Sequence, residues 1–217
     1  MKLFLDIETV PNYYSTVAHE IKDFEIFRKK FKSDVANLTV PEICQLYLER
    51  AALYAEFGRV VCVSLGYVSG EEIKLKSFCG DSEFQILTDT ASALQKATSI
   101  VAHNGKDFDY PFLCRRMIVN AVPLPDLLRI QNLKPWEIKL EDTIEMWKFG
   151  QFSYKASLES LCNLFEIPSP KTDMSGADVA HVFYVDKDYE RISKYCEGDV
   201  SALINVYRTM QYQDILT

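Results

Sequence analysis

The stretch MKLFLDIETV, Met1–Val10, decides the fold and carries the first chemical signal of the chain. Its apolar run is typical of a strand that is buried on both faces of a sheet. Two acids, Asp6 and Glu8, interrupt the end of that run. Because side chains on a strand alternate between faces, both carboxylates leave the same face, about 7 Å apart. Desolvated carboxylates repel each other, so the pair predicts either a divalent metal site or two acids at an exposed strand edge.

The composition is that of an ordinary globular protein, with 217 residues of which 48% are hydrophobic and 25% charged. No apolar run approaches the roughly 20 residues of a membrane span. The first strand begins without a signal-peptide pattern before it. The formal net charge of -7 at pH 7 argues against binding a long duplex through many phosphates. It is compatible with holding a few nucleotides through metal ions.

The cysteines show no C-x-x-C pairing, and several stand inside apolar runs. We interpret them as small buried hydrophobic residues in a reducing compartment, which favours a cytoplasmic protein without a disulfide frame or a zinc site. They are Cys44, Cys62, Cys79, Cys114, Cys162 and Cys196.

The order of the remaining segments predicts an α/β protein. A helical insertion of about residues 13–57 follows the first strand, and a β-hairpin with its turn at Ser69–Glu71 comes next. Later strands are expected at Ser99–Ala102 and residues 136–140, and helices at 81–98, after 103, at 156–165, 177–184 and 187–211. A strand that pairs with a hairpin and later with a parallel strand implies a mixed sheet with helices packed on it. No repeat or linker divides the chain, so one domain of residues 1–217 is expected.

The insertion is locally basic. Its helices are expected at residues 13–31 and 41–57, with Thr39 as a cap before Pro41. The basic residues form either a solvated helix face or an arm that contacts phosphates. They are Arg28, Lys29, Lys30 and Lys32.

A further acid, Asp109, stands at the start of the helix that follows the fourth strand. Asn104 comes directly after that strand, and Phe108 precedes the acid. An acid in a first turn is also favoured by the helix dipole alone. Asp107 competes with Asp109 for any role in a site.

The final helix places Asp199 against an apolar stripe, where a carboxylate needs a partner. Tyr195 lies one turn earlier on the same side. Gly198 permits a close approach to the backbone. The alternative is a tyrosine half-buried in the core and an aspartate paired with a lysine.

Together, three motifs resemble the exonuclease motifs of the DEDD superfamily in its tyrosine-bearing (DEDDy) form. They are Asp6-x-Glu8, Asn104-x-x-x-Phe108-Asp109 and Tyr195-x-x-x-Asp199. The chain resembles stand-alone bacterial proteins related to the proofreading exonuclease domain of family B DNA polymerases. The likeness runs over nearly the whole chain, through EFGRVVCVSLGYV, AHNGKDFDYPFL, SLESLCNLFEIPSPK and YCEGDV. It implies a ribonuclease-H-like fold with a mixed five-stranded sheet, flanking helices and the insertion as an addition.

Four carboxylates without a cysteine or histidine cluster favour the hard ions Mg²⁺ or Mn²⁺. The resemblance implies two ions, one bound by Asp6, Glu8 and Asp199 and the second mainly by Asp6, with Asp109 in its outer sphere. Tyr195, with an ordinary pKa near 10, is a poor base at neutral pH, so we expect it to orient the attacking water or the phosphate.

The resemblance also assigns residues around the terminal nucleotide. Thr9, Asn104 and Phe108 are expected to bind the substrate. Asp142 follows the fifth strand, where related proteins often carry an acid, and is expected to support the site from outside it. His103 is interpreted as structural.

The sequence therefore predicts a metal-dependent 3′–5′ exonuclease that acts on a nucleic acid 3′ end, with single-stranded DNA favoured and RNA as a second substrate. A phosphatase of the haloacid dehalogenase class also begins with a strand-end acid pair, but its second acid is aspartate where this chain has Glu8. A catalytically weak module that binds nucleic acid or protein on the same fold is the other alternative. Nuclease activity with and without Mn²⁺ separates these possibilities.

Overall fold

The computed structural model describes residues 1–168 and 174–216. Among them, five strands form one sheet in the order β3-β2-β1-β4-β5. The pairs β1–β2 and β2–β3 are antiparallel, and β1–β4 and β4–β5 are parallel, which confirms the predicted mixed sheet. The strands are β1 (Lys2–Pro11), β2 (Gly58–Ser69), β3 (Glu72–Cys79), β4 (Ser99–Ala102) and β5 (Leu140–Asp142).

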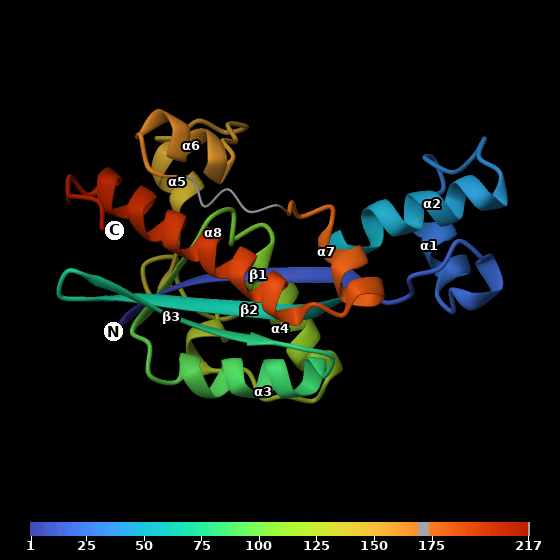
Figure 1. Ribbon diagram of the computed structural model, residues 1–217, viewed down its shortest axis with the longest axis horizontal. Coiled ribbons are helices and arrows are strands. Elements are labelled where there is room, and N and C mark those ends of the chain that lie inside the picture. Colours follow the sequence, from blue (N-terminus) through green and yellow to red (C-terminus); the bar gives the residue numbers. More distant parts are fainter. Residues whose placement is uncertain (169–173, 217) are drawn as a thin grey trace.

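Helices cover both faces of this sheet (Figure 1). On one face, α3 (Glu83–Leu94) and α4 (Asp109–Val119) share a core with Leu3, Leu5 and Ile7 of β1. On the other face lies α8 (Tyr189–Met210), which packs against Phe4 and the strands beside it. The alternation along β1 therefore turns Asp6 and Glu8 toward α8.

Close contact between α8 and the sheet depends on a glycine in β2. A Cβ atom at Gly66 would lie 2.6 Å from Cγ1 of Val200 and 2.9 Å from Cδ1 of Ile204. Such distances are far inside van der Waals contact, so a larger residue would push α8 away from the strands. Gly66 thus fixes how near α8 brings its side chains to β1.

The strand β1 has a register shift between Glu8 and Thr9. Asp6 lies opposite Ser64, and Glu8 lies opposite Cys62, before the shift. A bulge re-aims the side chains around it and is common beside functional sites. Pro11 is the last residue of the strand, opposite Gly58.

The shorter elements differ in part from expectation. The expected bounds of the last strand, residues 136–140, are wrong. Its pairing with β4 begins at Leu140 and continues to Asp142. The helix α5 (Thr143–Trp147) was not predicted, and it begins where the Asp142 carboxylate accepts the N–H of Ile144 at 2.9 Å. The helices expected at 156–165 and 177–184 are α6 (Leu158–Leu164) and α7 (Val179–His181), the latter continued by the π-helical turn Val182–Asp186. Most of the proline-rich loop before α7 lies outside the described residues.

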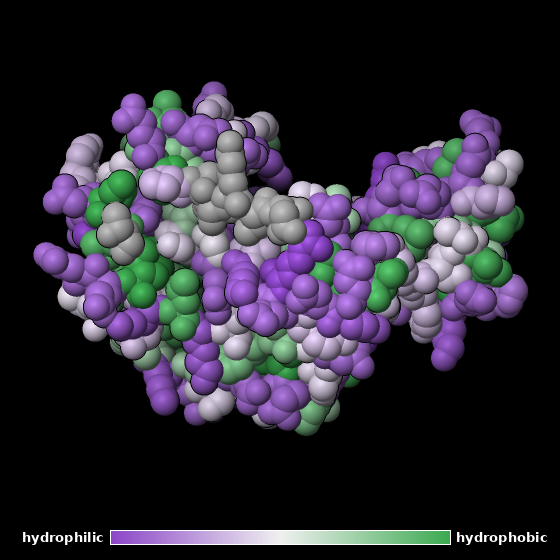
Figure 2. All heavy atoms as spheres, viewed as in Figure 1, coloured by the Kyte–Doolittle hydropathy of each residue, from purple (hydrophilic) through white to green (hydrophobic). Residues whose placement is uncertain are grey.

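Residues 12–57 form a helical arm between β1 and β2, which stands out from the body of the molecule (Figures 1 and 2). Its elements are the 3₁₀ turns Ala18–Glu20 and Ala51–Leu53 and the helices α1 (Phe24–Lys30) and α2 (Val40–Arg50). Aromatic rings form its core, with the Phe27 ring 5.0 Å from that of Tyr47 and 5.3 Å from that of Phe57. The expected cap is present, because Glu42 accepts the backbone N–H of Thr39 at 2.7 Å.

The expectation of a helix from residue 13 is wrong at its start, because the first helical turn begins at Ala18. At the base of the arm, Tyr14 stacks on Tyr184 of the body at a ring distance of 5.1 Å. In the basic cluster, Arg28 pairs with Glu25 at 3.0 Å and Lys30 with Glu56 at 3.1 Å. These surface pairs favour the interpretation as a solvated helix face.

Candidate active site

The structure brings the four predicted carboxylates within electrostatic reach of one another. Asp6 and Glu8 extend from β1, Asp109 is the first residue of α4, and Asp199 lies in α8. The pKa of Asp6 is raised well above its ordinary range by burial and then by the charges of Glu8, Asp109 and Asp199. The site therefore lies between the end of β1 and the two helices that cover opposite faces of the sheet.

The other three acids share this electrostatic environment. Burial and then nearby groups, Asp199 among them, raise the pKa of Glu8 well above its usual range. Burial raises the pKa of Asp109 to about 7, opposed by backbone hydrogen bonds from Asp109 and Ile7. Burial also raises the pKa of Asp199 to about 6. Such acids accept protons readily unless a cation lies among them.

No basic side chain of the described residues compensates these charges through an ion pair. The ion pairs among residues 1–168 and 174–216 do not include Asp6, Glu8, Asp109 or Asp199. Because a buried carboxylate without a partner is costly, the donor set fits a divalent cation. The acidity of the cluster thus has the chemistry of a metal site.

Tyr195 lies one helical turn before Asp199, and its hydroxyl lowers the pKa of that carboxyl, against the larger effect of burial. Burial and the charges of Asp199, Glu8 and Asp6 raise the pKa of the phenol well above its ordinary value. The phenol is therefore protonated at neutral pH and can donate a hydrogen bond, but it cannot act as a base. Gly176 lies beside it, since a Cβ there would be 4.0 Å from the Tyr195 hydroxyl.

The sequence did not reveal that Cys196 belongs to this site. Its thiol donates to Oδ2 of Asp6 at 3.2 Å, and ligand atoms of Asp6, Glu8 and Cys196 lie within 4.8 Å of one another. Asp109 and Asp199 do not join them at this distance. Cys62 lies opposite Glu8 in the sheet, and Cys196 and Cys79 are neighbours that raise the pKa of its thiol.

A third cysteine completes this group, since Cys79 lies directly opposite Cys62 in the β2–β3 pair. Among the described residues, the thiol of Cys196 joins Asp6 and Glu8 as a possible metal ligand, so one cysteine is added to the carboxylates that the sequence predicted. The missing information is the packing of α8 on the sheet, which brings the Cys196 thiol to Asp6. A thiol is a softer ligand than a carboxylate and widens the range of metals that the site can take.

The residues expected to bind substrate border this cluster in sequence and have structural roles of their own. The Thr9 hydroxyl donates to the carbonyl of Ala52 at 2.8 Å and attaches the arm beside the acids. Asn104 has a φ of 61° and begins the turn that leads into α4. Phe108 is half-buried, with its ring 5.4 Å from that of Phe112. Contacts between these residues and a nucleotide remain predictions.

Two supporting residues hold that turn in place. Asp142 is 4% exposed, and its carboxylate accepts the backbone N–H groups of Asn104 and Lys106, each at 3.0 Å. His103 lies 2.8 Å from the Thr143 hydroxyl and 2.9 Å from the Ala156 carbonyl. These bonds agree with a structural role for His103. They position the backbone from which Asp109 extends.

Asp107 and Asp109 have different surroundings. Asp109 is 4% exposed and lies within the cluster, whereas Asp107 is exposed and lies 3.7 Å from Lys155.

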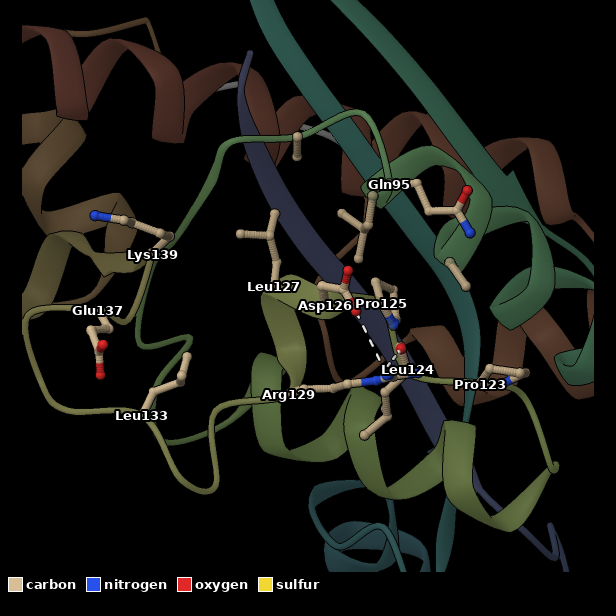
Figure 3. A pocket seen from close by; sticks show the side chains of 13 residues that line it. Gln95, Pro123, Leu124, Pro125, Asp126, Leu127, Arg129, Leu133, Glu137 and Lys139 are labelled. Carbon is tan, nitrogen blue, oxygen red and sulfur yellow. Dashed lines mark hydrogen bonds and ion pairs between the residues drawn. The ribbon is translucent and has the colours of Figure 1, made fainter.

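A cavity of about 640 Å³ elsewhere in the molecule is lined by residues such as Leu94, Leu127 and Arg129 (Figure 3). None of the four acids of the cluster lines it.

A sequence model of one protein family matches residues 52–216, and the family is described as a predicted 3′–5′ exonuclease related to the exonuclease domain of PolB. The chain belongs to this family. The matched region contains Asp109, Tyr195 and Asp199 and begins after β1, which carries Asp6 and Glu8. A comparison with curated proteins gave no match.

The fold of this family member agrees with a polymerase structure. The family B DNA polymerase of Pyrobaculum calidifontis aligns with 97% of the chain at a TM-score of 0.62 and 13% sequence identity. The alignment covers 24% of the polymerase chain. The ribonuclease-H-like fold that the resemblance implied is thereby confirmed. No helix among the described residues has the length and apolar character needed to cross a membrane.

Proposed function

We propose that this family member removes nucleotides from a free 3′ end by metal-dependent hydrolysis and releases nucleoside 5′-monophosphates. The observation that supports it is the convergence of Asp6, Glu8, Asp109 and Asp199 from three elements, with no cationic partner among the described residues. Membership of a family described as predicted 3′–5′ exonucleases also supports the proposal.

Each residue has a role that its surroundings permit. Asp6, Glu8 and Asp199 would hold the ions, and Asp109 would support them from nearby. Two bound Mg²⁺ or Mn²⁺ ions supply the charge that activates the attacking water and stabilises the departing 3′ oxygen. Tyr195 stays protonated, so its hydroxyl donates a hydrogen bond that orients the water or the phosphate.

Single-stranded DNA is the favoured substrate, with RNA as a second one. The chain has a net charge of -7, and two of the basic residues of the arm are already paired with acids. A duplex is bound mainly through many phosphate contacts, whereas a single strand also offers base faces. We therefore expect frayed or single-stranded 3′ ends to be degraded faster than a blunt duplex.

The test uses 5′-labelled single-stranded DNA with Mn²⁺, Mg²⁺ or a chelator, resolved as a time course. A ladder that shortens from the 3′ end only with metal is expected, together with no reaction on a 3′-blocked strand. Asp6→Asn should abolish the ladder, while Asp126→Asn, at a fully exposed side chain, should keep it. Cleavage of a closed circular strand at a comparable rate would contradict exonuclease action. Binding of DNA without any product in Mn²⁺ would instead favour a binding module.

A further inference from the structure

A loop beside the candidate active site exposes aromatic rings to water. We call residues 148–156, between α5 and α6, the aromatic loop. Within it, Phe149 is 89% exposed, Phe152 is 96% exposed and Tyr154 is 42% exposed. Scattered apolar residues on a surface are ordinary, but a group of large rings in one short loop marks a binding surface. The mechanism proposed above uses none of these residues.

Both ends of this region are fastened to the turn that leads into the site. His103 lies 2.8 Å from the hydroxyl of Thr143 at the start of α5 and 2.9 Å from the carbonyl of Ala156 at the end of the aromatic loop. Lys155 lies 3.7 Å from Asp107, two residues before Asp109. The loop is therefore attached directly to the segment between β4 and α4 that carries part of the active site.

The backbone at the start of the loop has a sharp turn. Phe149 has a φ of 43° and Gly150 a φ of 84°, so the chain turns sharply after α5. Lys148 and Lys155 bracket the rings and form pairs with Glu145 and Asp107. The Lys155 pair is exposed, with both side chains 70% accessible, and such a pair is readily exchanged for a phosphate. The loop thus interleaves aromatic faces with cations.

We propose that the aromatic loop binds unpaired bases of the nucleic acid strand, upstream of the 3′ end, by stacking on Phe149 and Phe152. This proposal rests on the function proposed above, because it concerns the strand whose end enters the site. Rings of this kind bind single strands of any sequence, since every base offers a π-face. Bases inside a duplex are stacked on their neighbours and offer no free face. Stacking also suits a chain with net charge -7, because it depends little on phosphate contacts.

The experiment measures binding without catalysis. The anisotropy of a fluorescein-labelled ten-nucleotide oligothymidylate is followed in chelator for the wild type, for Phe149→Ala/Phe152→Ala and for Phe84→Ala. Phe84 is the matched control, since it is 55% exposed but lies in α3. The double variant removes both rings and should bind at least about five-fold more weakly, which is the effect of losing even one base stack. Phe84→Ala should bind as the wild type does. Equal affinity in the double variant and the wild type would overturn the proposal.

Two further measurements separate stacking from other contacts. A ten-residue abasic strand keeps the phosphates and lacks the bases, so the wild type and the double variant should bind it equally. Phe149→Leu/Phe152→Leu keeps an apolar surface without rings and should bind the oligothymidylate as weakly as the alanine variant. Full affinity in the leucine variant would show plain hydrophobic contact, and a loss on the abasic strand would show a phosphate contact; either result overturns stacking.

The outcome is distinguishable from failure of the proposed function. If the wild type hydrolyses nothing in Mn²⁺ and the double variant still loses affinity, the exonuclease proposal fails and the aromatic loop stands. If hydrolysis is normal and the affinities are equal, the loop proposal fails and the exonuclease stands.

Discussion

The thiol of Cys196 lies 3.2 Å from Oδ2 of Asp6 and donates to it. A soft sulfur ligand therefore stands directly beside the acid that the proposed function requires for both ions. Carboxylates alone favour Mg²⁺ and Mn²⁺, whereas an added thiolate favours Zn²⁺ and Cd²⁺. The site should accordingly be sensitive to thiophilic metals in a way that four carboxylates would not be.

We expect Cd²⁺ to inhibit hydrolysis supported by Mn²⁺, and Cys196→Ser to raise the half-inhibiting Cd²⁺ concentration about ten-fold. The measurement is the rate of 3′ shortening across a Cd²⁺ series. Cys114→Ser is the control, because that half-buried cysteine lies in α4 with its thiol near the carbonyl of Leu128. Equal inhibition of Cys196→Ser and the wild type would show that sulfur does not bind the metal.

The second prediction separates the roles of the tyrosine and the aspartate in α8. Tyr195→Phe removes one hydrogen bond and no metal ligand, so turnover should fall about ten- to hundred-fold while Mn²⁺ affinity is kept. Asp199→Asn should lower both. Steady-state rates and Mn²⁺ titration by calorimetry measure the two effects. The assignment is reversed if Tyr195→Phe weakens Mn²⁺ binding as much as Asp199→Asn does.

The third prediction follows from the raised pKa of Asp6. Burial and neighbouring charges raise this pKa, so the ionised cluster destabilises the metal-free protein at neutral pH. Asp6→Asn should therefore have a higher Tm than the wild type in chelator. Adding Mn²⁺ at a hundredfold excess over its Kd should stabilise the wild type by about 2.7 kcal/mol and the variant by much less. A variant that melts lower and gains as much from the metal would contradict a shared site.

The fourth prediction concerns pH and His103. Burial lowers the pKa of this imidazole, so the unfolded chain takes up a proton near pH 6.5 while the folded protein remains neutral. Since the unfolded state binds more protons there, the contribution of His103 to stability is present above about pH 6.5 and is lost as the pH falls through the folded pKa. The difference in unfolding free energy between the wild type and His103→Gln should shrink between pH 7.5 and 5.5.

Urea titrations across that pH range measure this difference. His19→Gln is the control, because His19 is exposed in the arm. An unchanged difference between the wild type and His103→Gln at all pH values would show that His103 is not held neutral by its surroundings.

The fifth prediction concerns a buried ion pair that joins the arm, the sheet and two helices. Arg116 donates to both oxygens of Glu83, at 2.9 and 2.6 Å, and to the carbonyl of Ala55 at 2.9 Å. Glu83 also accepts the backbone N–H of Val60 at 2.8 Å. Glu83→Ala leaves a buried guanidinium without its partner and should cost about 3–5 kcal/mol in the free energy of unfolding.

Urea denaturation measures this cost. Glu190→Ala is the matched control, because Glu190 pairs with Lys194 at 2.7 Å on the surface, and exposed pairs contribute about 0–1 kcal/mol. Similar losses in the two variants would show that the buried pair contributes no more than a surface one.

Local patterns were sufficient for most of the fold. A pattern of a few residues predicted each of three elements, which are the strand β1, the hairpin turn at Ser69–Glu71 and the helix α8. Patterns failed where a distant partner decides the outcome. Tyr14, where a helix was expected, stacks on the distant Tyr184, and the Asp142 carboxylate accepts the N–H of Ile144 at the start of α5. Neither contact can be read from the surrounding sequence.

The candidate site divides in the same way. Asp6 and Glu8 interrupt an apolar strand, and Asp199 and Tyr195 stand beside an apolar stripe, so the sequence itself marks them, whereas Asp109 is an ordinary first-turn acid that only its spacing from Asn104 and Phe108 suggests. Cys196 carries no such mark, because a thiol in an apolar stripe is an ordinary core residue. The packing of α8 against β1 reveals it, because its thiol lies 3.2 Å from Oδ2 of Asp6. A site residue that looks like an ordinary core residue in the sequence, such as Cys196, is identified from the structure.

The pairing of Pro11 with Gly58 has a consequence for how this protein can change. Because these two residues face each other in adjacent strands, the whole arm occupies the place of a hairpin turn. Closing a longer loop costs little entropy, about 0.6 kcal/mol for each doubling of its length. The length of the arm can therefore change at low entropic cost, provided that the contacts of its base, Thr9 with Ala52 and Arg116 with Ala55, are kept. New surface can thus be built at the far end of the arm, away from the strand pairing that holds the carboxylates.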